Sequence, residues 1–102
     1  MLPDLKKMFP EKYKEWQQKC FKRDNYMCQF IKENGKKCCY RSLIHPHHIV
    51  PKNESLALAF DVDNSITLCY KHHMYIHRNG LEKIYASKFR EIIKNNNLKD
   101  KK

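Results

Sequence analysis

All six histidines of this chain lie within one stretch, between residues 45 and 77. His47 and His48 stand near its head. His73 and His77 lie at its tail, four residues apart, so they share one face if that segment is helical. Neutral imidazoles are good ligands for divalent transition metals, and an imidazole without metal can act as a general base near neutral pH. The spacing therefore predicts a metal-assisted, acid–base site.

The segments around these histidines predict a strand, a long loop, a second strand and a helix. Residues 44–50 read as an extended run, residues 65–70 as a second one, and residues 71–78 as a short helix closed by an Asn-Gly pair. Folding in this order would bring together His47, His48, His73 and His77. His45 has no role in this pattern. We expect it to be a strand residue at the surface, held extended by the following proline.

Cysteines predict a second, structural metal site. The five cysteines are an odd number, which fits poorly with complete disulfide pairing, and a cytosolic location favours metal over disulfides. Cys69 and His72 form a C-x-x-H knuckle. Cys28, with Cys38 or Cys39, would complete a Cys₃His set, a ligand set that zinc accepts in closed tetrahedral sites.

The choice between the two adjacent cysteines depends on a predicted hairpin over residues 27–40, with an Asn-Gly turn at residues 34–35. If these two residues form the whole turn, Cys28 and Cys39 point to the same side and Cys38 points to the other. A longer turn would reverse that choice.

Flanking helices are predicted on both sides of a core spanning about residues 16–80. The first, over residues 11–23, carries an apolar stripe with Trp16 and Cys20, and Cys20 is expected to be a small buried side chain. The last, over about residues 81–94, has an apolar face and ends in a polar tail at residues 95–102. That face comprises Leu81, Ile84, Tyr85, Phe89, Ile92 and Ile93. In the loop at residues 52–62, we expect packing of Leu56, Leu58 and Phe60.

Length and charge restrict the class of protein. A chain of 102 residues predicts a single domain, and 21 basic against 11 acidic side chains give a net charge of +10. That balance favours a polyanionic partner, for which nucleic acid is the commonest candidate. No apolar run approaches the length of a membrane span and no secretory signal is visible, so we expect a cytoplasmic protein without a membrane partner.

The histidine stretch resembles the HNH nuclease family, also called ββα-metal nucleases. The matching text is HHIVP at residues 47–51, DN at 63–64, LCYKHH at 68–73 with IH at 76–77, and the upstream RDNYMCQ at 23–29. The resemblance covers about residues 16–77. It implies an α+β fold: a small ββα-metal domain with a zinc-stapled hairpin and flanking helices.

Site residues are implied by the same resemblance. His47, His73 and His77 would bind a catalytic divalent ion (Mg²⁺, Mn²⁺, Ni²⁺ or Zn²⁺), and His48 would be the general base. Asn64 would fix the loop that holds the base and polarise its imidazole. The implied activity is DNA endonuclease cleavage, a phosphodiester hydrolysis that gives a 5′ phosphate and a 3′ hydroxyl. Arg41 and Arg78 are candidates for additional charge in the transition state.

The resemblance also bears on the structural Zn²⁺. Zinc-carrying HNH proteins usually have two C-x-x-C pairs, whereas this chain has a histidine in the fourth position and a stretched first pair. In the family pattern the second cysteine falls eight residues before the first metal-binding histidine, which is Cys39 here. The implied ligands are Cys28, Cys39, Cys69 and His72, with Cys38 as the alternative to Cys39.

Short HNH proteins of this size often belong to phages and other mobile elements. This implies action in a host cytoplasm, contact with DNA mainly through backbone phosphates, phage packaging proteins as candidate partners, and a monomer or weak homodimer. The main alternative is a non-catalytic, zinc-stapled basic DNA-binding module, which would not need His48. A transferred toxin domain of the same chemistry is a third hypothesis.

Overall fold

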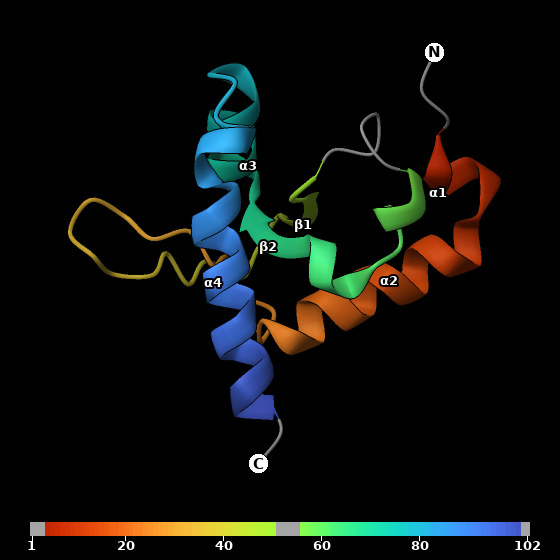
Figure 1. Ribbon diagram of the computed structural model, residues 1–102, viewed down its shortest axis with the longest axis horizontal. Helices are drawn as coiled ribbons and strands as arrows, with labels where there is room; N and C mark the ends of the chain where they lie inside the picture. The colour runs from red at the N-terminus through yellow and green to blue at the C-terminus, as the bar shows by residue number, and fades with distance from the viewer. Residues whose placement is uncertain (1–3, 51–55, 101–102) are drawn as a thin grey trace.

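The computed structural model describes residues 4–50 and 56–100, and it has an α+β fold (Figure 1). Strands β1 (Ile44–His48) and β2 (Ser65–Cys69) form a two-stranded antiparallel sheet, and helix α3 (Tyr70–Arg78) follows β2 directly. The register pairs Ile44 with Cys69 and His48 with Ser65. The predicted α+β class and the order strand, loop, strand, helix are therefore confirmed.

Helix α3 ends at the predicted residue and begins one residue earlier than predicted, at Tyr70. Cys69 stands at the N-cap position with extended backbone angles and no side-chain capping hydrogen bond, whereas Asn79 caps the last turn by donating to the carbonyl of Tyr75. Gly80 follows with a φ of +59°, a left-handed conformation that glycine adopts without steric cost. The Asn-Gly pair is thus the stop signal of this helix.

Two helices precede the sheet. In α1 (Leu5–Met8) the side chain of Asp4 accepts a hydrogen bond from the backbone N–H of Lys7, and α2 (Pro10–Arg23) begins with its proline in the first turn. The predicted stripe of α2 is buried, with Trp16 only 2% exposed and Cys20 fully buried. Cys20 is therefore a small core side chain, as expected.

A buried ion pair ties the end of α2 to β2. Arg23 donates through Nε and Nη2 to both carboxylate oxygens of Asp24, at 2.9 and 2.8 Å, and through Nη2 to the carbonyl of Ser65 at 2.7 Å. Asp24 also accepts from the backbone N–H of Thr67 at 2.9 Å. Because each charge has several partners, their burial is compensated and the strand is fixed against the helix.

Helix α4 (Glu82–Asp100) is longer than predicted. The tail predicted at residues 95–102 is wrong for residues 95–100, which remain helical, while residues 101–102 lie outside the described chain. Asn96 is buried and donates to Asp24 Oδ1 at 2.9 Å and to Gln29 Oε1 at 3.0 Å. These contacts come from residues 72 and 67 positions earlier, so local sequence could not reveal them.

One member of the predicted apolar face of α4 is misplaced. Ile84 is 72% exposed, whereas Phe89 and Ile93 are buried. At about 100° per residue, Ile84 projects well away from the direction that Tyr85, Phe89 and Ile93 share. Tyr85, Phe89 and Ile93 face the hydrophobic core. Its buried residues are Cys28, Phe30, Ile49, Ile66, Leu68, Cys69, Ile76, Phe89 and Ile93.

Two short 3₁₀ turns, at Leu56–Leu58 and Val62–Asn64, occupy the connection between the strands. Leu58 and Phe60 are half-buried, and the ring of Phe60 lies 6.0 Å from that of Phe9. The side chain of Leu56 and residues 51–55 lie outside the described part, so the predicted packing of Leu56 stays a prediction.

None of the helices among the described residues combines the length and the apolar composition that a membrane span requires.

Candidate metal centres

The cysteine hairpin, residues 28–40, has a different turn from the predicted one. Lys32 accepts a hydrogen bond from the N–H of Gly35 and donates its own N–H to the carbonyl of Lys36, both at 2.9 Å. Gly35 has a φ of +80°. This is the geometry of a three-residue loop, in which a tight turn is followed by a left-handed residue. The two-residue turn is therefore wrong.

That extra turn residue changes which cysteine joins the site. Cys38 donates its backbone N–H to the carbonyl of Phe30 at 2.8 Å, so the two residues are opposite each other, and Cys28 lies on the same face. Cys39 is exposed and has a φ of +61°. The preference for Cys39 is accordingly corrected to Cys38.

Four side chains then converge at the junction of the hairpin, β2 and α3. The ligand atoms of Cys28, Cys38, Cys69 and His72 lie within 4.8 Å of one another. His72 Nδ1 is 3.5 Å from the sulfur of Cys28 and 3.3 Å from that of Cys69. Zinc bonds of about 2.3 Å to sulfur and about 2.0 Å to nitrogen would separate such donors by roughly 3.6 Å in a tetrahedron. This Cys₃His cluster can hold a metal ion, and its donors fit zinc.

The pKa values of the cluster side chains indicate that metal binding would release a proton from Cys28. Burial raises the pKa of the Cys28 thiol to about 12, although hydrogen bonds from the backbone of Cys69 and Phe30 oppose the rise. Burial also lowers the pKa of His72, and the nearby charges of Lys71 and Lys32 lower it further. A cation would deprotonate the thiol and meet an already neutral imidazole.

Three imidazoles form a second cluster between β1 and α3. The donor nitrogens of His47, His73 and His77 lie within 4.8 Å of one another, and Nε2 of His73 is 2.9 Å from Nε2 of His77. Two nitrogens bound to one ion at about 2.0–2.1 Å would lie roughly 3 Å apart. The sequence prediction that these three residues meet is borne out by their positions.

His47 lacks the partners that a buried imidazole needs. It is 1% exposed, and neither ring nitrogen has a hydrogen-bond partner among the described residues. Burial lowers its pKa to about 3, with further contributions from His73, His77 and His48. Burial, and then His77, lower the pKa of His73 to about 4. Neutral imidazoles with unsatisfied nitrogens suit a divalent ion better than a proton.

Glu82 supports this cluster from α4, and sequence reasoning missed it. Its Oε2 lies 3.3 Å from Nδ1 of His77, whose Nε2 points toward His73. A carboxylate on the far nitrogen orients a metal-binding histidine and fixes its tautomer. No motif marks Glu82, because it lies in the next helix, beyond the Asn-Gly stop.

His48 points to the other side of β1, toward α2, and is not one of the three clustered donors. Its ring is stacked on that of Trp16, with centroids 4.5 Å apart and an interplanar angle of 18°. Nε2 lies 2.9 Å from the carbonyl of Ala59, which can only accept, so Nε2 carries a proton and, in the neutral ring, the lone pair is on Nδ1. His48 is near enough to lower the pKa values of His47 and His73.

Asn64 holds the connection between the strands. Its Oδ1 accepts from the N–H of Val50 at 2.8 Å, and its Nδ2 donates to the carbonyls of Val50 and Leu58 at 3.0 and 3.3 Å. This is the loop-fixing arrangement expected of it. The carbonyl that contacts the imidazole of His48 belongs to Ala59, so any effect of Asn64 on that ring is indirect.

The remaining candidates lie around the cluster. His45 shares a face of β1 with His47, and its ring is stacked 5.6 Å from that of His73. Arg41 is exposed and donates to the carbonyl of Asn25 at 3.1 Å, and Arg78 is exposed at the end of α3. The stacking of His45 on His73 is a contact that the sequence pattern did not predict.

No family model matches this sequence, and neither does any curated protein or solved structure. A function is therefore inferred from the geometry of the two clusters.

Proposed function

We propose that this protein is a metal-dependent DNA endonuclease of the HNH type, stapled by a structural Zn²⁺ in its Cys₃His cluster. One observation carries the proposal: a strand and a helix bring His47, His73 and His77 together, and the next residue of the strand, His48, presents an imidazole on its other face. A purely structural module would have no need to bury the unpartnered ring of His47.

In this proposal one face of β1 contributes to metal binding and the other carries the general base. His47, His73 and His77 would hold a divalent ion, which would supply positive charge against a non-bridging phosphate oxygen and the departing 3′ oxygen. Glu82 keeps Nε2 of His77 directed at the ion by contacting the opposite nitrogen.

His48 acts as the general base. The carbonyl of Ala59 holds the proton on Nε2, so Nδ1 is the nitrogen that removes a proton from the attacking water. Stacking on Trp16 holds the ring in one orientation during this transfer. Attack on phosphorus then yields a 5′ phosphate and a 3′ hydroxyl.

DNA is the proposed substrate because the net charge of +10 favours a polyanion. We expect phosphate contacts to dominate, so affinity should fall steeply as salt is raised. The basic surface and the Cys₃His cluster would also suit the alternative, a binding module that does not cut.

Nicking of supercoiled plasmid separates the two functions. The zinc-loaded protein should nick in the presence of an added divalent ion, and His48→Ala should lose at least a hundredfold of this activity while retaining DNA binding. His45→Ala, which removes another imidazole from the same strand, is the matched control and should keep most of the activity. DNA binding without nicking in Mg²⁺, Mn²⁺, Ni²⁺ or Zn²⁺ would establish the binding module instead.

A further inference from the structure

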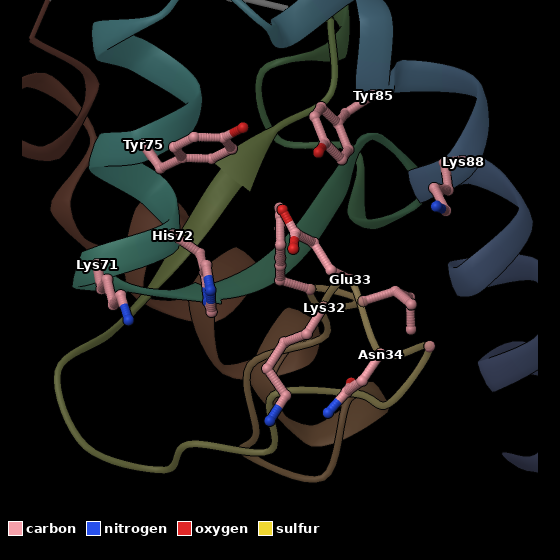
Figure 2. Close-up of a pocket in the computed structure, with 11 residues that line it drawn as sticks. Lys32, Glu33, Asn34, Lys71, His72, Tyr75, Tyr85 and Lys88 are labelled. Atoms are coloured by element: carbon pink, nitrogen blue, oxygen red, sulfur yellow. The ribbon is translucent and has the colours of Figure 1, made fainter.

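A groove of about 840 Å³ lies between residues 30–35 of the cysteine hairpin and the helices α3 and α4 (Figure 2). Tyr75 lines it from α3. Because Tyr75 is two residues from both His73 and His77, it projects about 200° around the helix from them. This hairpin groove is therefore on the opposite side of α3 from the histidine cluster.

Cations and aromatic rings line the hairpin groove together. Lys32, Lys71 and Lys88 supply three exposed ammonium groups, against one carboxylate from Glu33 among the described lining residues. Figure 2 shows Tyr75 and Tyr85 on one side of the groove and the hairpin side chains on the other, with Lys71 and Lys88 toward its two ends in this view. The lining thus combines positive charge along its length with rings that a planar ligand can reach.

The groove shares Lys32, Lys71 and His72 with a second cavity at the start of α3, whose floor includes Cys38 and Cys69 of the Cys₃His cluster. The second cavity adds three exposed apolar side chains. They are Tyr40, Leu43 and Tyr70, which are 54%, 71% and 51% exposed. Lys32 and Lys71, which line both cavities, therefore have an exposed tyrosine in the groove and two more in the second cavity. These side chains form one continuous strip.

We propose that the hairpin groove and this second cavity bind a segment of single-stranded nucleic acid. Lys32, Lys71 and Lys88 would contact its phosphates. Unpaired bases would stack on Tyr75 in the groove and on Tyr40 or Tyr70 in the second cavity. A positive groove with exposed rings is the usual way in which proteins hold single strands without reading their sequence.

Other anions fit this lining less well. In a duplex the bases are stacked on one another, so their faces cannot reach the tyrosines. An acidic peptide would contact the lysines but has no aromatic ring to stack on the tyrosines, and its carboxylates would meet Glu33. A base can instead donate a hydrogen bond to Glu33, through the ring N3–H in thymine or through an amino group in the other bases. The proposal does not depend on nuclease activity, because the two sites lie on opposite sides of α3.

Fluorescence anisotropy with the full-length, zinc-loaded protein and a labelled twelve-nucleotide oligothymidine, without other divalent ions, tests the proposal. Tyr75→Leu should weaken binding of this single strand by roughly five- to a hundredfold, since stacking of one base contributes about that much. Tyr75→Phe keeps the ring and should bind like the parent protein. The matched control is Tyr26→Leu: Tyr26 is 44% exposed, Tyr75 45%, and only Tyr75 lines the groove.

Salt dependence tests the lysines. Lys32→Gln and Lys88→Gln should each reduce the slope of log K against log salt by about 0.7, the single-strand value per phosphate. Lys14→Gln, on α2, should leave the slope unchanged. If Tyr75→Leu proves less stable in thermal melting, Tyr70→Leu provides the same stacking test.

Two results would overturn the proposal: binding of the oligonucleotide that is unchanged in folded Tyr75→Leu and Tyr70→Leu, or equally strong competition by a polyglutamate peptide. His48→Ala should bind the oligonucleotide like the parent protein. A protein that never nicks plasmid but needs Tyr75 for single-strand binding would refute the proposed nuclease and leave the groove proposal standing. The reverse pattern would refute only the groove.

Discussion

Trp16 of α2 is stacked on His48 of β1, with ring centroids 4.5 Å apart and the two planes 18° from parallel. The indole Nε1 of Trp16 donates to the carbonyl of Asp61 at 3.2 Å, so the ring is itself fixed to the loop between the strands. A helix that precedes the sheet by some 20 residues thus determines the orientation of the proposed general base.

Trp16→Leu should therefore reduce plasmid nicking by on the order of 10- to 100-fold, because small misplacements of a catalytic group are that costly. The substitution also removes core volume, so nicking is compared at a temperature where both proteins are folded by circular dichroism. Trp16→Phe keeps the stacked ring and loses only the Nε1 donor, and it should retain more activity. Equal activity of the Leu and Phe variants would show that stacking does not orient His48.

Cys38→Ser and Cys39→Ser form a matched pair of neighbouring substitutions. Cys38 belongs to the Cys₃His cluster and Cys39 is exposed, so only Cys38→Ser should lose the bound zinc, expected at about one ion per chain. Because structural zinc contributes folding free energy outright, that variant should also melt at a much lower temperature. Metal analysis and thermal melting measure both effects. Zinc loss in Cys39→Ser alone would contradict the observed hairpin register.

Burial of His47 should make stability depend on pH. Its pKa falls from the ordinary 6.5 to about 3, so between these values the unfolded chain binds a proton that the folded chain excludes. The unfolding free energy should therefore decrease as pH falls below about 6.5, by at most about 1.4 kcal/mol per pH unit from this residue.

Comparing the parent protein with His47→Leu isolates the contribution of His47 to this pH dependence. Loss of zinc at low pH affects both proteins equally and therefore cancels. Denaturant unfolding at pH 7 and pH 5, with one equivalent of zinc and no other divalent ion, should show the variant gaining stability relative to the parent at the lower pH. A difference that does not change with pH would mean that His47 titrates normally.

Asn96 and Asn95 provide a test of the extended α4. Asn96 is buried with hydrogen bonds to Asp24 and Gln29, while Asn95 is exposed. Asn96→Ala leaves two buried acceptors without this donor and should lower the unfolding free energy by about 1–3 kcal/mol. Asn95→Ala should change it by less than about 0.5 kcal/mol. Similar values for the two variants would indicate that the end of α4 does not pack as described.

The sequence by itself determined the α+β order of elements and the meeting of three histidines. Both depend on short-range patterns: two short extended runs, a four-residue spacing that puts His73 and His77 on one helix face, and the Asn-Gly stop. His47 then had to lie near them, because a short antiparallel sheet leading directly into a helix leaves little freedom in the arrangement.

Only the tertiary structure decided which cysteine completes the Cys₃His cluster and what surrounds the imidazoles. One additional turn residue, with Gly35 in a left-handed conformation, reverses the faces of Cys38 and Cys39. The sequence could not show this, because two-residue and three-residue loops both accommodate an Asn-Gly pair. Side chains distant in sequence make the other decisive contacts: Trp16 with His48, and Asn96 with Asp24. Such contacts depend on how helices pack across the sheet, and the spacing of residues within one element carries no information about that packing.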